Sequence, residues 1–278
     1  MNGNPEPALR RIALLRDRVG DWQRYPFVVP SIAGLRAIDV SSRVLFFVGE
    51  NGSGKSTLLE AIALACGFGR EGGTRNFSFS TQMKSAQGEV TADEAAIDLL
   101  ADALRLSWTA KRQRDGFFLR AESFYNVASY LDRLKREEEE SGRRPLALSS
   151  YGGVSLHSRS HGESFLTLLL ERFSGKGLYL IDEPEAALSA SRQLALLARM
   201  RYLLDRFAET QFIIATHSPI VLAFPGAQIC AFDGGEIRPI AYRDTDAYVI
   251  TRRFLENPAR MLDELFASDD AAAEAEAD

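Results

Sequence analysis

The chain has 278 residues, is 46% hydrophobic and carries a formal net charge of −5, with an isoelectric point of about 5.4. This length and apolar content suffice for one large α/β domain or two small ones, and the acidic balance gives no overall electrostatic reason to expect a nucleic acid as partner. The two cysteines, Cys66 and Cys230, are far apart and accompany only three histidines, so neither a disulfide framework nor a zinc site is indicated.

The N-terminal segment and the hydropathy pattern predict a cytoplasmic protein. Residues 1–11 hold two prolines and a glutamate where a signal peptide needs an apolar run. No later segment approaches the ~20 apolar residues that span a bilayer. We therefore expect no direct insertion into a membrane.

Apolar runs alternating with helical patterns predict a parallel sheet. Runs of strand length lie at residues 12–15, 27–29, 43–49, 177–184 and 211–219. The last three are continuous, as in buried parallel strands. Leucines recur at helical spacing within residues 189–207, which gives the order strand, helix, strand. The expected fold class is α/β, with helices packed on a parallel sheet.

The region from about 84 to 165 differs in composition from the rest. It is richer in charge, has helical periodicity at 93–104 and contains a candidate hairpin turn at 111–116. We expect a mostly helical subdomain inserted into a single domain that spans residues 1–268. Residues 269–278 are acidic, rich in alanine and without an apolar face, which predicts a disordered tail.

Residues 49–57, GENGSGKST, match the phosphate-loop pattern G-x-x-x-x-G-K-[ST] between an apolar strand and a helical segment, the context that the pattern requires. The glycines let backbone N–H groups turn toward a phosphate, and the helix N-terminus adds its dipole. Lys55 would reach the β- and γ-phosphates, and Ser56 would bind magnesium. A glycine-rich turn without a ligand is the alternative. The predicted nucleotide-binding residues are Gly49, Glu50, Asn51, Gly52, Ser53, Gly54, Lys55, Ser56 and Thr57.

Two carboxylates and a histidine follow the apolar runs at 177–184 and 211–219. Ligands of parallel α/β sheets collect beyond the carboxyl ends of the strands, so these side chains should meet beside the phosphate loop. Asp182 suits the water shell of magnesium, and Glu183 suits polarisation of the attacking water. His217 would contact the γ-phosphate and hold that water. A turn or helix cap for the acids and a structural role for the histidine are the alternatives.

The stretch SHGES, residues 160–164, holds a serine, a histidine and a glutamate in one local segment. A catalytic triad needs groups that converge in space on the nucleophile, and the strained G-x-S-x-G turn is absent, so a triad is disfavoured. Ser160 and Glu163 before an apolar run fit a helix capping box. A capped helix N-terminus is also an anion site, so both interpretations share one geometry.

Four motifs in order, GENGSGKST, SHGES, LYLIDEPEAALS and IIATHSP, resemble the Walker A, signature, Walker B with D-loop, and H-loop motifs of an ABC-type ATPase. The resemblance covers most of residues 25–240 and is greatest to soluble bacterial ATPases with a SHGES-like signature. It implies a P-loop core with an N-terminal β subdomain and an inserted helical subdomain, and ATP and Mg²⁺ as cofactors. It also implies that Ser160, Gly162 and Glu163 act in trans, in a head-to-tail homodimer enclosing two ATP molecules.

Some positions depart from the pattern of that family. His161 and Glu163 stand where transporters have other residues of LSGGQ. For the Q-loop, which contacts the metal side of the site, the sequence offers Glu122, favoured here, or Gln82. For the aromatic residue that stacks on adenine, Tyr25 and Phe27 are both placed suitably, and each is equally suited to the core.

Three roles are compatible with these motifs. The first is a nucleotide-driven switch that acts on an unidentified protein partner. The second is the ATP-binding subunit of a membrane transporter, against which the atypical signature and EPEAALS stand. The third is the ATPase of a DNA-repair or phage-defence complex. Long SMC-like arms are disfavoured, because about one hundred residues between phosphate loop and signature cannot hold a long coiled coil.

Overall fold

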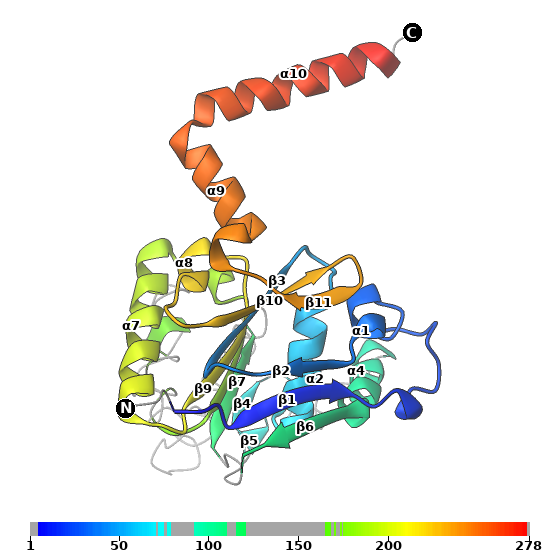
Figure 1. The fold of residues 1–278 in the computed structure, drawn as a ribbon, viewed down its shortest axis with the longest axis vertical. Coiled ribbons are helices and arrows are strands. Elements are labelled where there is room, and N and C mark those ends of the chain that lie inside the picture. The colour runs from blue at the N-terminus through cyan, green and yellow to red at the C-terminus, as the bar shows by residue number, and fades with distance from the viewer. Residues whose placement is uncertain are drawn as a thin grey trace, which may run out of the picture.

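A computed structural model describes residues 5–70, 72–74, 77–78, 92–109, 115–120, 165–167, 170, 173 and 175–276. Two sheets and the helices on them form the body, and a pair of C-terminal helices extends away from it (Figure 1). The predictions on SHGES, Gln82 and Glu122 lie outside the described residues.

The large sheet has eight strands in the order β11-β10-β3-β9-β8-β7-β4-β5. Its five central strands, from β10 to β7, are parallel, and β11, β4 and β5 are antiparallel additions at the edges. The strands are β3 (Val44–Gly49), β4 (Gly73–Thr74), β5 (Phe77–Ser78), β7 (Gly116–Arg120), β8 (Leu178–Asp182), β9 (Gln211–Ala215), β10 (Gln228–Asp233) and β11 (Glu236–Pro239). The predicted α/β class and the three long strands are confirmed.

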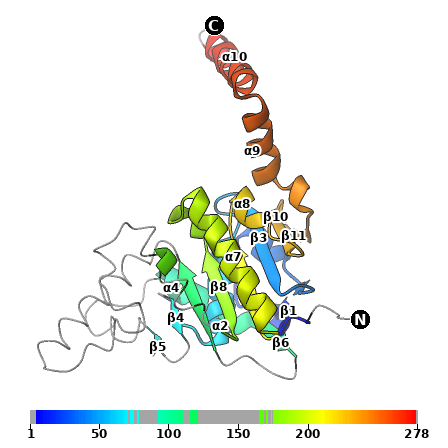
Figure 2. The same cartoon turned by 90° about the vertical axis from the view of Figure 1, so that its left-hand side faces the viewer.

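Helices cover both faces of this sheet, so its central strands are buried on both sides (Figures 1 and 2). Successive residues of β3 point to opposite faces of the sheet. Phe46 packs in one core cluster with Leu196 and Met200 of α7 (Ala190–Arg206). Phe47 packs in the other core cluster with Ile62 of α2 (Lys55–Cys66). The body helices are α1 (Pro30–Gly34), α2 (Lys55–Cys66), α4 (Ala92–Ala103), α7 (Ala190–Arg206) and α8 (Pro219–Leu222), with 3-10 turns η1 (Arg16–Arg18), η4 (Pro184–Ala186) and η5 (Tyr242–Asp244).

The small sheet is antiparallel, in the order β2-β1-β6, and confirms the expected N-terminal β subdomain. It consists of β1 (Leu9–Leu14), β2 (Ala37–Asp39) and β6 (Leu104–Trp108). The predicted strand at 27–29 is wrong: these residues form turns that lead into α1. Pro26 and Pro30 bracket them, and proline favours turns and the first position of a helix over a paired strand.

The body also includes residues that the sequence assigned to the inserted subdomain. Helix α4 is confirmed, but β6 pairs with β1 and β7 pairs with β8, so both strands belong to the body. Residues 111–114 of the expected hairpin turn lie outside the described residues. The strands on either side of it, β6 and β7, lie in different sheets and do not pair with each other. Residues 79–91, 110–114 and 121–164 lie outside the described chain, and the inserted subdomain stays a prediction.

The C-terminus consists of α9 (Asp246–Glu256) and α10 (Pro258–Glu276). Helix α10 continues through residues that the sequence predicted to be disordered, because alanine and glutamate both have high helix propensity. The domain boundary at residue 268 stays a prediction. In the described part of the chain, no helix combines the length and the apolar content needed to cross a bilayer.

One buried side chain joins the two sheets. Gln211, at the start of β9, accepts a hydrogen bond from the Leu9 backbone N–H at 2.8 Å and donates one to the Leu9 carbonyl at 3.1 Å. Both residues are fully buried. Gln211, in the large sheet, thus provides hydrogen-bond partners for the backbone N–H and carbonyl of Leu9 in the small sheet.

We expect Gln211→Leu to lower the free energy of unfolding by about 2–4 kcal/mol, because a donor and an acceptor would stay buried without partners. Urea unfolding followed by circular dichroism measures this. Gln23→Leu, at an exposed side chain, is the matched control and should change stability by less than about 0.5 kcal/mol. Equal stability of the two variants would contradict the proposed link.

Candidate functional site

The phosphate loop lies between β3 and α2, as the sequence predicted. Its backbone has left-handed geometry at Gly49, Gly52 and Gly54, with φ of 146°, 78° and 96°. A Cβ on Gly49 would lie 2.5 Å from the carbonyl oxygen of Phe232, so only glycine fits between β3 and β10 here. Helix α2 begins at Lys55, directly after Gly54, and its N-terminus therefore faces the loop.

Lys55 is the buried cation of the site, with 3% of its surface exposed. Its Nζ donates to the Glu50 carbonyl oxygen at 2.8 Å. Burial lowers the pKa of Lys55, and the carboxylates of Glu183, Asp182 and Glu185 act in the opposite direction. The loop thus holds an ammonium group whose negative partners all come from the end of β8 and the turn after it.

Ser56 and Asp182 form the second contact between loop and sheet. The Ser56 hydroxyl donates to Asp182 Oδ1 at 2.9 Å, and Asp182 is buried. A hydroxyl and a carboxylate oxygen side by side are the hard ligands that Mg²⁺ prefers. The described residues contain no cluster of three or more His, Cys, Asp or Glu that could hold a metal alone. Mg²⁺ commonly uses one or two carboxylates and takes its other ligands from water and phosphate, so this pair fits it.

Arg120, at the end of β7, is a residue of this site that the sequence reasoning missed. Its Nη1 lies 3.0 Å from Glu60 Oε2 of α2, and its Nε lies 3.7 Å from Asp182 Oδ2. Arg120 and Asp182 are partners in the parallel register of β7 and β8. An arginine at the carboxyl end of a strand was the available signal, but its partners depend on the strand order.

Glu183 and His217 lie together where β8 and β9 end. His217 Nε2 is 3.6 Å from Glu183 Oε1, and both side chains are about one-third exposed, at 38% and 36%. Glu183 has φ of 48° and ψ of 56°, the left-handed conformation, and among the described residues it is the only non-glycine with positive φ. Such strain is typical of functional turns. Here it turns the chain at the strand end.

Burial and the positive charge of Lys55 lower the pKa of His217, and the charges of Glu183 and Glu185 oppose this shift. The Nε2 atom is buried and has no hydrogen-bond partner within the described chain. A neutral imidazole with one unsatisfied nitrogen therefore faces the space between Glu183 and the loop. Buried polar atoms in folded proteins almost always have a hydrogen-bond partner, so we expect His217 Nε2 to gain one from outside the described chain.

Glu185 is the second residue that the sequence reasoning missed. One carboxylate oxygen accepts the Thr216 hydroxyl at 2.8 Å, and the other accepts the backbone N–H of His217. Glu185 lies in η4, directly after the Asp182–Pro184 turn, and it fastens that turn to the segment that carries His217. Its local sequence, an acid after DEP, gives no sign of a partner about thirty residues away.

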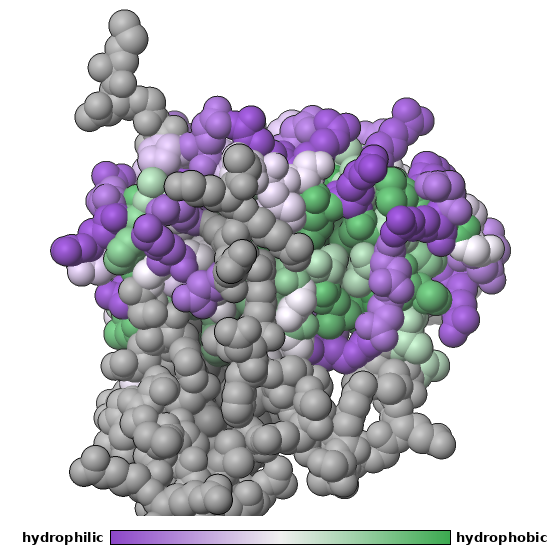
Figure 3. Space-filling model, turned by 90° about the horizontal axis from the view of Figure 1, so that it is seen from below, coloured by the Kyte–Doolittle hydropathy of each residue, from purple (hydrophilic) through white to green (hydrophobic). Residues whose placement is uncertain are grey.

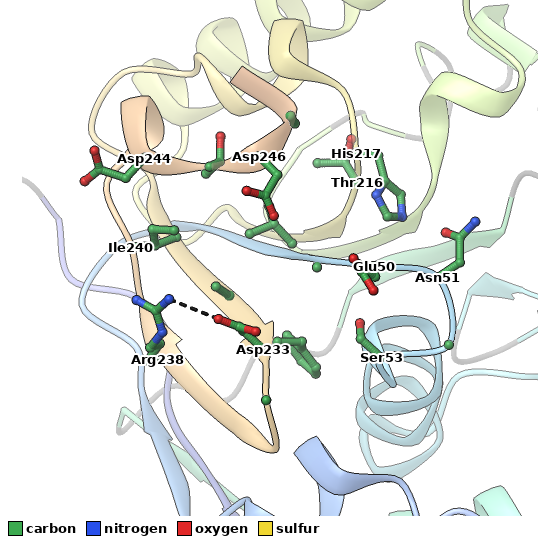
Figure 4. A pocket seen from close by; sticks show the side chains of 18 residues that line it. Glu50, Asn51, Ser53, Thr216, His217, Asp233, Arg238, Ile240, Asp244 and Asp246 are labelled. Carbon is green, nitrogen blue, oxygen red and sulfur yellow. Dashed lines mark hydrogen bonds and ion pairs between the residues drawn. The ribbon is translucent and has the colours of Figure 1, made fainter. Parts of the chain in front are cut away.

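A cavity of about 450 Å³ borders the loop on the side of β10 and α9. Glu50 and Asn51 of the loop line one side, and Asp244 of η5 and Asp246, the first residue of α9, line another (Figure 4). His217 also lines this cavity. The C-terminal helices therefore begin at the wall of the candidate site.

The structure separates the two aromatic candidates for adenine stacking. Phe27 is 3% exposed and packs edge-on against Trp22 in the core, so its faces are occupied. Tyr25 is 37% exposed, and its hydroxyl lies 3.1 Å from Thr57 Oγ1 at the start of α2. The Phe27 alternative is wrong because its ring completes the core, and Tyr25 stays a prediction.

Two family models match overlapping parts of the chain. One, described as an AAA domain, matches residues 30–144. The other, described as "AAA domain, putative AbiEii toxin, Type IV TA system", matches residues 111–223. Together with the phosphate loop and the parallel sheet, these matches confirm the predicted resemblance to P-loop ATPases, here of the AAA type that the two models name. The SHGES-like signature of the ABC type stays a prediction. No curated protein matches the chain.

Solved structures similar to this chain include ATPase heads and cassettes. An SMC head domain from Thermotoga maritima has 16% sequence identity and a TM-score of 0.42, with 84% of this chain and 99% of that chain covered. A dimeric bacterial ABC transporter cassette has 16% identity and a TM-score of 0.38, with 76% and 91% covered. Because these identities and TM-scores are low, the similarity alone supports no conclusion. The assignment of the fold depends on the strand order and the phosphate loop.

We expect Glu185→Ala to release the segment that carries His217. Hydrogen exchange of the His217 amide should become about 10–100-fold faster, because its acceptor is lost. Glu236→Ala, at an exposed carboxylate of β11, is the matched control and should leave that rate unchanged. An unchanged His217 rate in Glu185→Ala would show that the carboxylate does not hold the segment.

Proposed function

We propose that this protein binds Mg-ATP, hydrolyses it to ADP and phosphate, and acts as a nucleotide-driven switch for an unidentified protein partner. The observation that carries the proposal is the convergence of five side chains at one edge of the sheet. They are the buried ammonium of Lys55, the hydrogen-bonded pair of Ser56 and Asp182, and the contact of Glu183 with His217. Their chemistry matches phosphoryl transfer, in which a protein supplies position and charge.

Each residue of the loop and the strand ends has one role in this proposal. The backbone N–H groups of residues 49–54 and the start of α2 bind the phosphates. Lys55 neutralises the β- and γ-phosphate oxygens. Ser56 and Asp182 hold Mg²⁺, which neutralises charge on the same oxygens when bound. Tyr25 stacks on adenine, and Thr57, its neighbour, adds a hydroxyl to the site.

Hydrolysis requires a base and an oriented water. Glu183 accepts a proton as the water oxygen attacks the γ-phosphorus, and the bond to the ADP oxygen breaks. His217, neutral because burial and Lys55 lower its pKa, contacts the γ-phosphate and orients the water. Glu185 acts through His217 by fixing its backbone, and is a positioning residue.

The residues outside the described chain enter the proposal through the family resemblance alone. Ser160, Gly162 and Glu163 are proposed to bind the γ-phosphate held by the other copy, so that two chains close head-to-tail around two ATP molecules. Glu122 is proposed to approach the metal side of the site. These assignments stay predictions.

Two other roles use the same chemistry. The description of the second family model names a type IV toxin–antitoxin system, which favours the ATPase of a defence complex as the second candidate. In that case ATP turnover would require, or be changed by, a neighbouring toxin or nuclease subunit. A transporter subunit would instead form a stable complex with a membrane permease.

We expect Glu183→Gln to lower turnover by about 10²–10⁴-fold while ATP affinity stays unchanged, because the base is lost and the phosphate contacts remain. Lys55→Ala should weaken ATP binding itself by about 10–100-fold. Phosphate release measures the first effect, and titration calorimetry the second. Glu236→Gln, on exposed β11, is the control for both. Wild-type turnover in Glu183→Gln would refute the assigned base.

Mixing two inactive variants tests the trans role of SHGES. Lys55→Ala lacks a working phosphate loop, and Gly162→Asp places a carboxylate where the γ-phosphate of the other copy would lie. Each alone should be inactive, and their mixture should regain part of the activity, because a mixed dimer contains one complete site. If the mixture stays inactive although the chains exchange, the trans assignment is wrong.

A further inference from the structure

Arg120, the last residue of β7, lies between two buried carboxylates. Its Nη1 is 3.0 Å from Glu60 Oε2 of α2, and its Nε is 3.7 Å from Asp182 Oδ2 of β8. The side chains of Glu60 and Asp182 are 7% and 9% exposed, and that of Arg120 is 24% exposed. One guanidinium group thus links a helix and a strand at the edge where the candidate site lies.

The strand register places Arg120 on the face of the sheet that α2 covers. β7 and β8 are parallel neighbours, and Arg120 and Asp182 are register partners at their carboxyl ends. Two residues earlier, Phe118 and Leu180 pack in the core cluster that contains Ile62 of α2. Because side chains alternate between the faces along a strand, Arg120 and Asp182 project from this same face.

Helix α2 provides a second link between the same groups. Ser56 and Glu60 are four residues apart and therefore lie one turn apart on one face of the helix. The Ser56 hydroxyl donates to Asp182 Oδ1 at 2.9 Å. Glu60 Oε2 accepts a hydrogen bond from Arg120 Nη1 at 3.0 Å. One face of α2 thus contacts both register partners.

This cluster differs from ion pairs at the protein surface. Seen from below, hydrophilic residues line much of the described surface of the body (Figure 3). Charge pairs between exposed side chains are solvated and contribute little. Glu60 and Asp182 are buried, and a buried carboxylate that loses its cation is costly. The contact with Arg120 therefore has a strong influence on how each carboxylate is oriented.

The two oxygens of Asp182 face different partners. Oδ1 accepts the Ser56 hydroxyl, whereas Oδ2 lies beside the guanidinium of Arg120. Ser56 and Asp182 are the pair that holds Mg²⁺ in the proposed function, and the inference drawn from this arrangement rests on that proposal. Oδ1 is the oxygen on the side of Ser56 and therefore of the metal.

The number of carboxylate oxygens offered to a metal distinguishes Mg²⁺ from Ca²⁺. Mg²⁺ demands near-octahedral geometry with short bonds, and the two oxygens of one carboxylate are too close together to occupy two octahedral positions. Ca²⁺ takes about six to eight ligands in a flexible geometry and often binds both oxygens of one carboxylate. To bind Ca²⁺ in that way, Asp182 would have to turn Oδ2 away from Arg120.

We propose that Arg120 is a positioning residue that makes the site selective for Mg²⁺ over Ca²⁺. It acts through Asp182: by holding Oδ2, the guanidinium keeps the carboxylate in the orientation that offers Oδ1 alone to the metal. Glu60 fixes the guanidinium from the side of α2. The planar group suits this task, because its nitrogens contact two carboxylates at once, whereas an ammonium is a single point charge.

The test compares the affinities of the full chain for the Mg²⁺ and Ca²⁺ complexes of AMP-PNP, an ATP analogue that is not hydrolysed, by titration calorimetry. We expect wild type to bind the Mg²⁺ complex about 10-fold more tightly than the Ca²⁺ complex. Arg120→Met removes the charge and the hydrogen bonds, and should bring the two affinities within about 2-fold of each other. Arg105→Met, at an exposed arginine of β6, is the matched control and should keep the wild-type ratio.

The ratio of the two affinities separates positioning from a structural role. A side chain that only stabilised the fold would, when lost, weaken the binding of both complexes equally and leave their ratio unchanged. Because the analogue is not hydrolysed, the ratio is also independent of the base and of the water that the proposed function requires.

A second variant keeps the test decisive if Arg120→Met is poorly folded. Arg120→Met alone leaves the buried carboxylate of Glu60 without this cation and should lower the melting temperature. Arg120→Met combined with Glu60→Met removes both charges and should recover most of that loss, but not the metal preference. Recovery of the preference in the double variant would show that Arg120 does not act through Asp182, and would overturn the proposal.

The outcomes distinguish this inference from the proposed function. Equal binding of both complexes by wild type, or a wild-type ratio in Arg120→Met, would overturn the role of Arg120 and leave the ATP proposal intact. A wild-type chain that binds AMP-PNP with neither metal would refute the proposed function, and the role of Arg120 with it. Loss of the preference in both Arg120 variants, together with its retention in Arg105→Met, would support the proposal.

Discussion

The buried ammonium of Lys55 is the interaction on which the candidate site depends. A cation that is almost fully excluded from water is costly unless hydrogen bonds and opposite charges surround it. Here the Glu50 carbonyl binds it directly, and the acids at the end of β8 and in the turn after it oppose the effect of burial on its pKa. The loop and the strand end are therefore held in one electrostatic unit. That unit gathers, at a single edge of the sheet, the charges on which the proposed ATP site depends.

Side chains from neighbouring strands extend this unit. Arg120 joins Asp182 to Glu60, so that β7, β8 and α2 share one set of charges. Glu185 joins the turn after β8 to the segment after β9, and this fixes the backbone of His217. A displacement at the turn would consequently reach His217 through two hydrogen bonds. This is a physical route by which a neighbouring chain that touches the turn would affect hydrolysis.

The C-terminal arm, formed by α9 and α10, begins beside the site. Its first helix starts at the cavity beside the loop, and its apolar surface begins within one turn of that start. The body buries its apolar residues between a sheet and helices, whereas seven large apolar side chains of the arm are exposed.

The sequence by itself determined the phosphate loop, the buried parallel strands, helices α4 and α7, and the carboxyl-edge location of Asp182, Glu183 and His217. These features follow from local sequence patterns, namely glycine spacing, continuous apolar runs and helical periodicity, each of which can be recognised within a short segment of the chain. The tertiary structure alone decided that β6 and β7 lie in different sheets, that Phe27 completes the core while Tyr25 stays exposed, and that Arg120 and Glu185 serve the site. Each of these depends on which distant segment packs alongside, and local propensity carries no information about a partner thirty or more residues away.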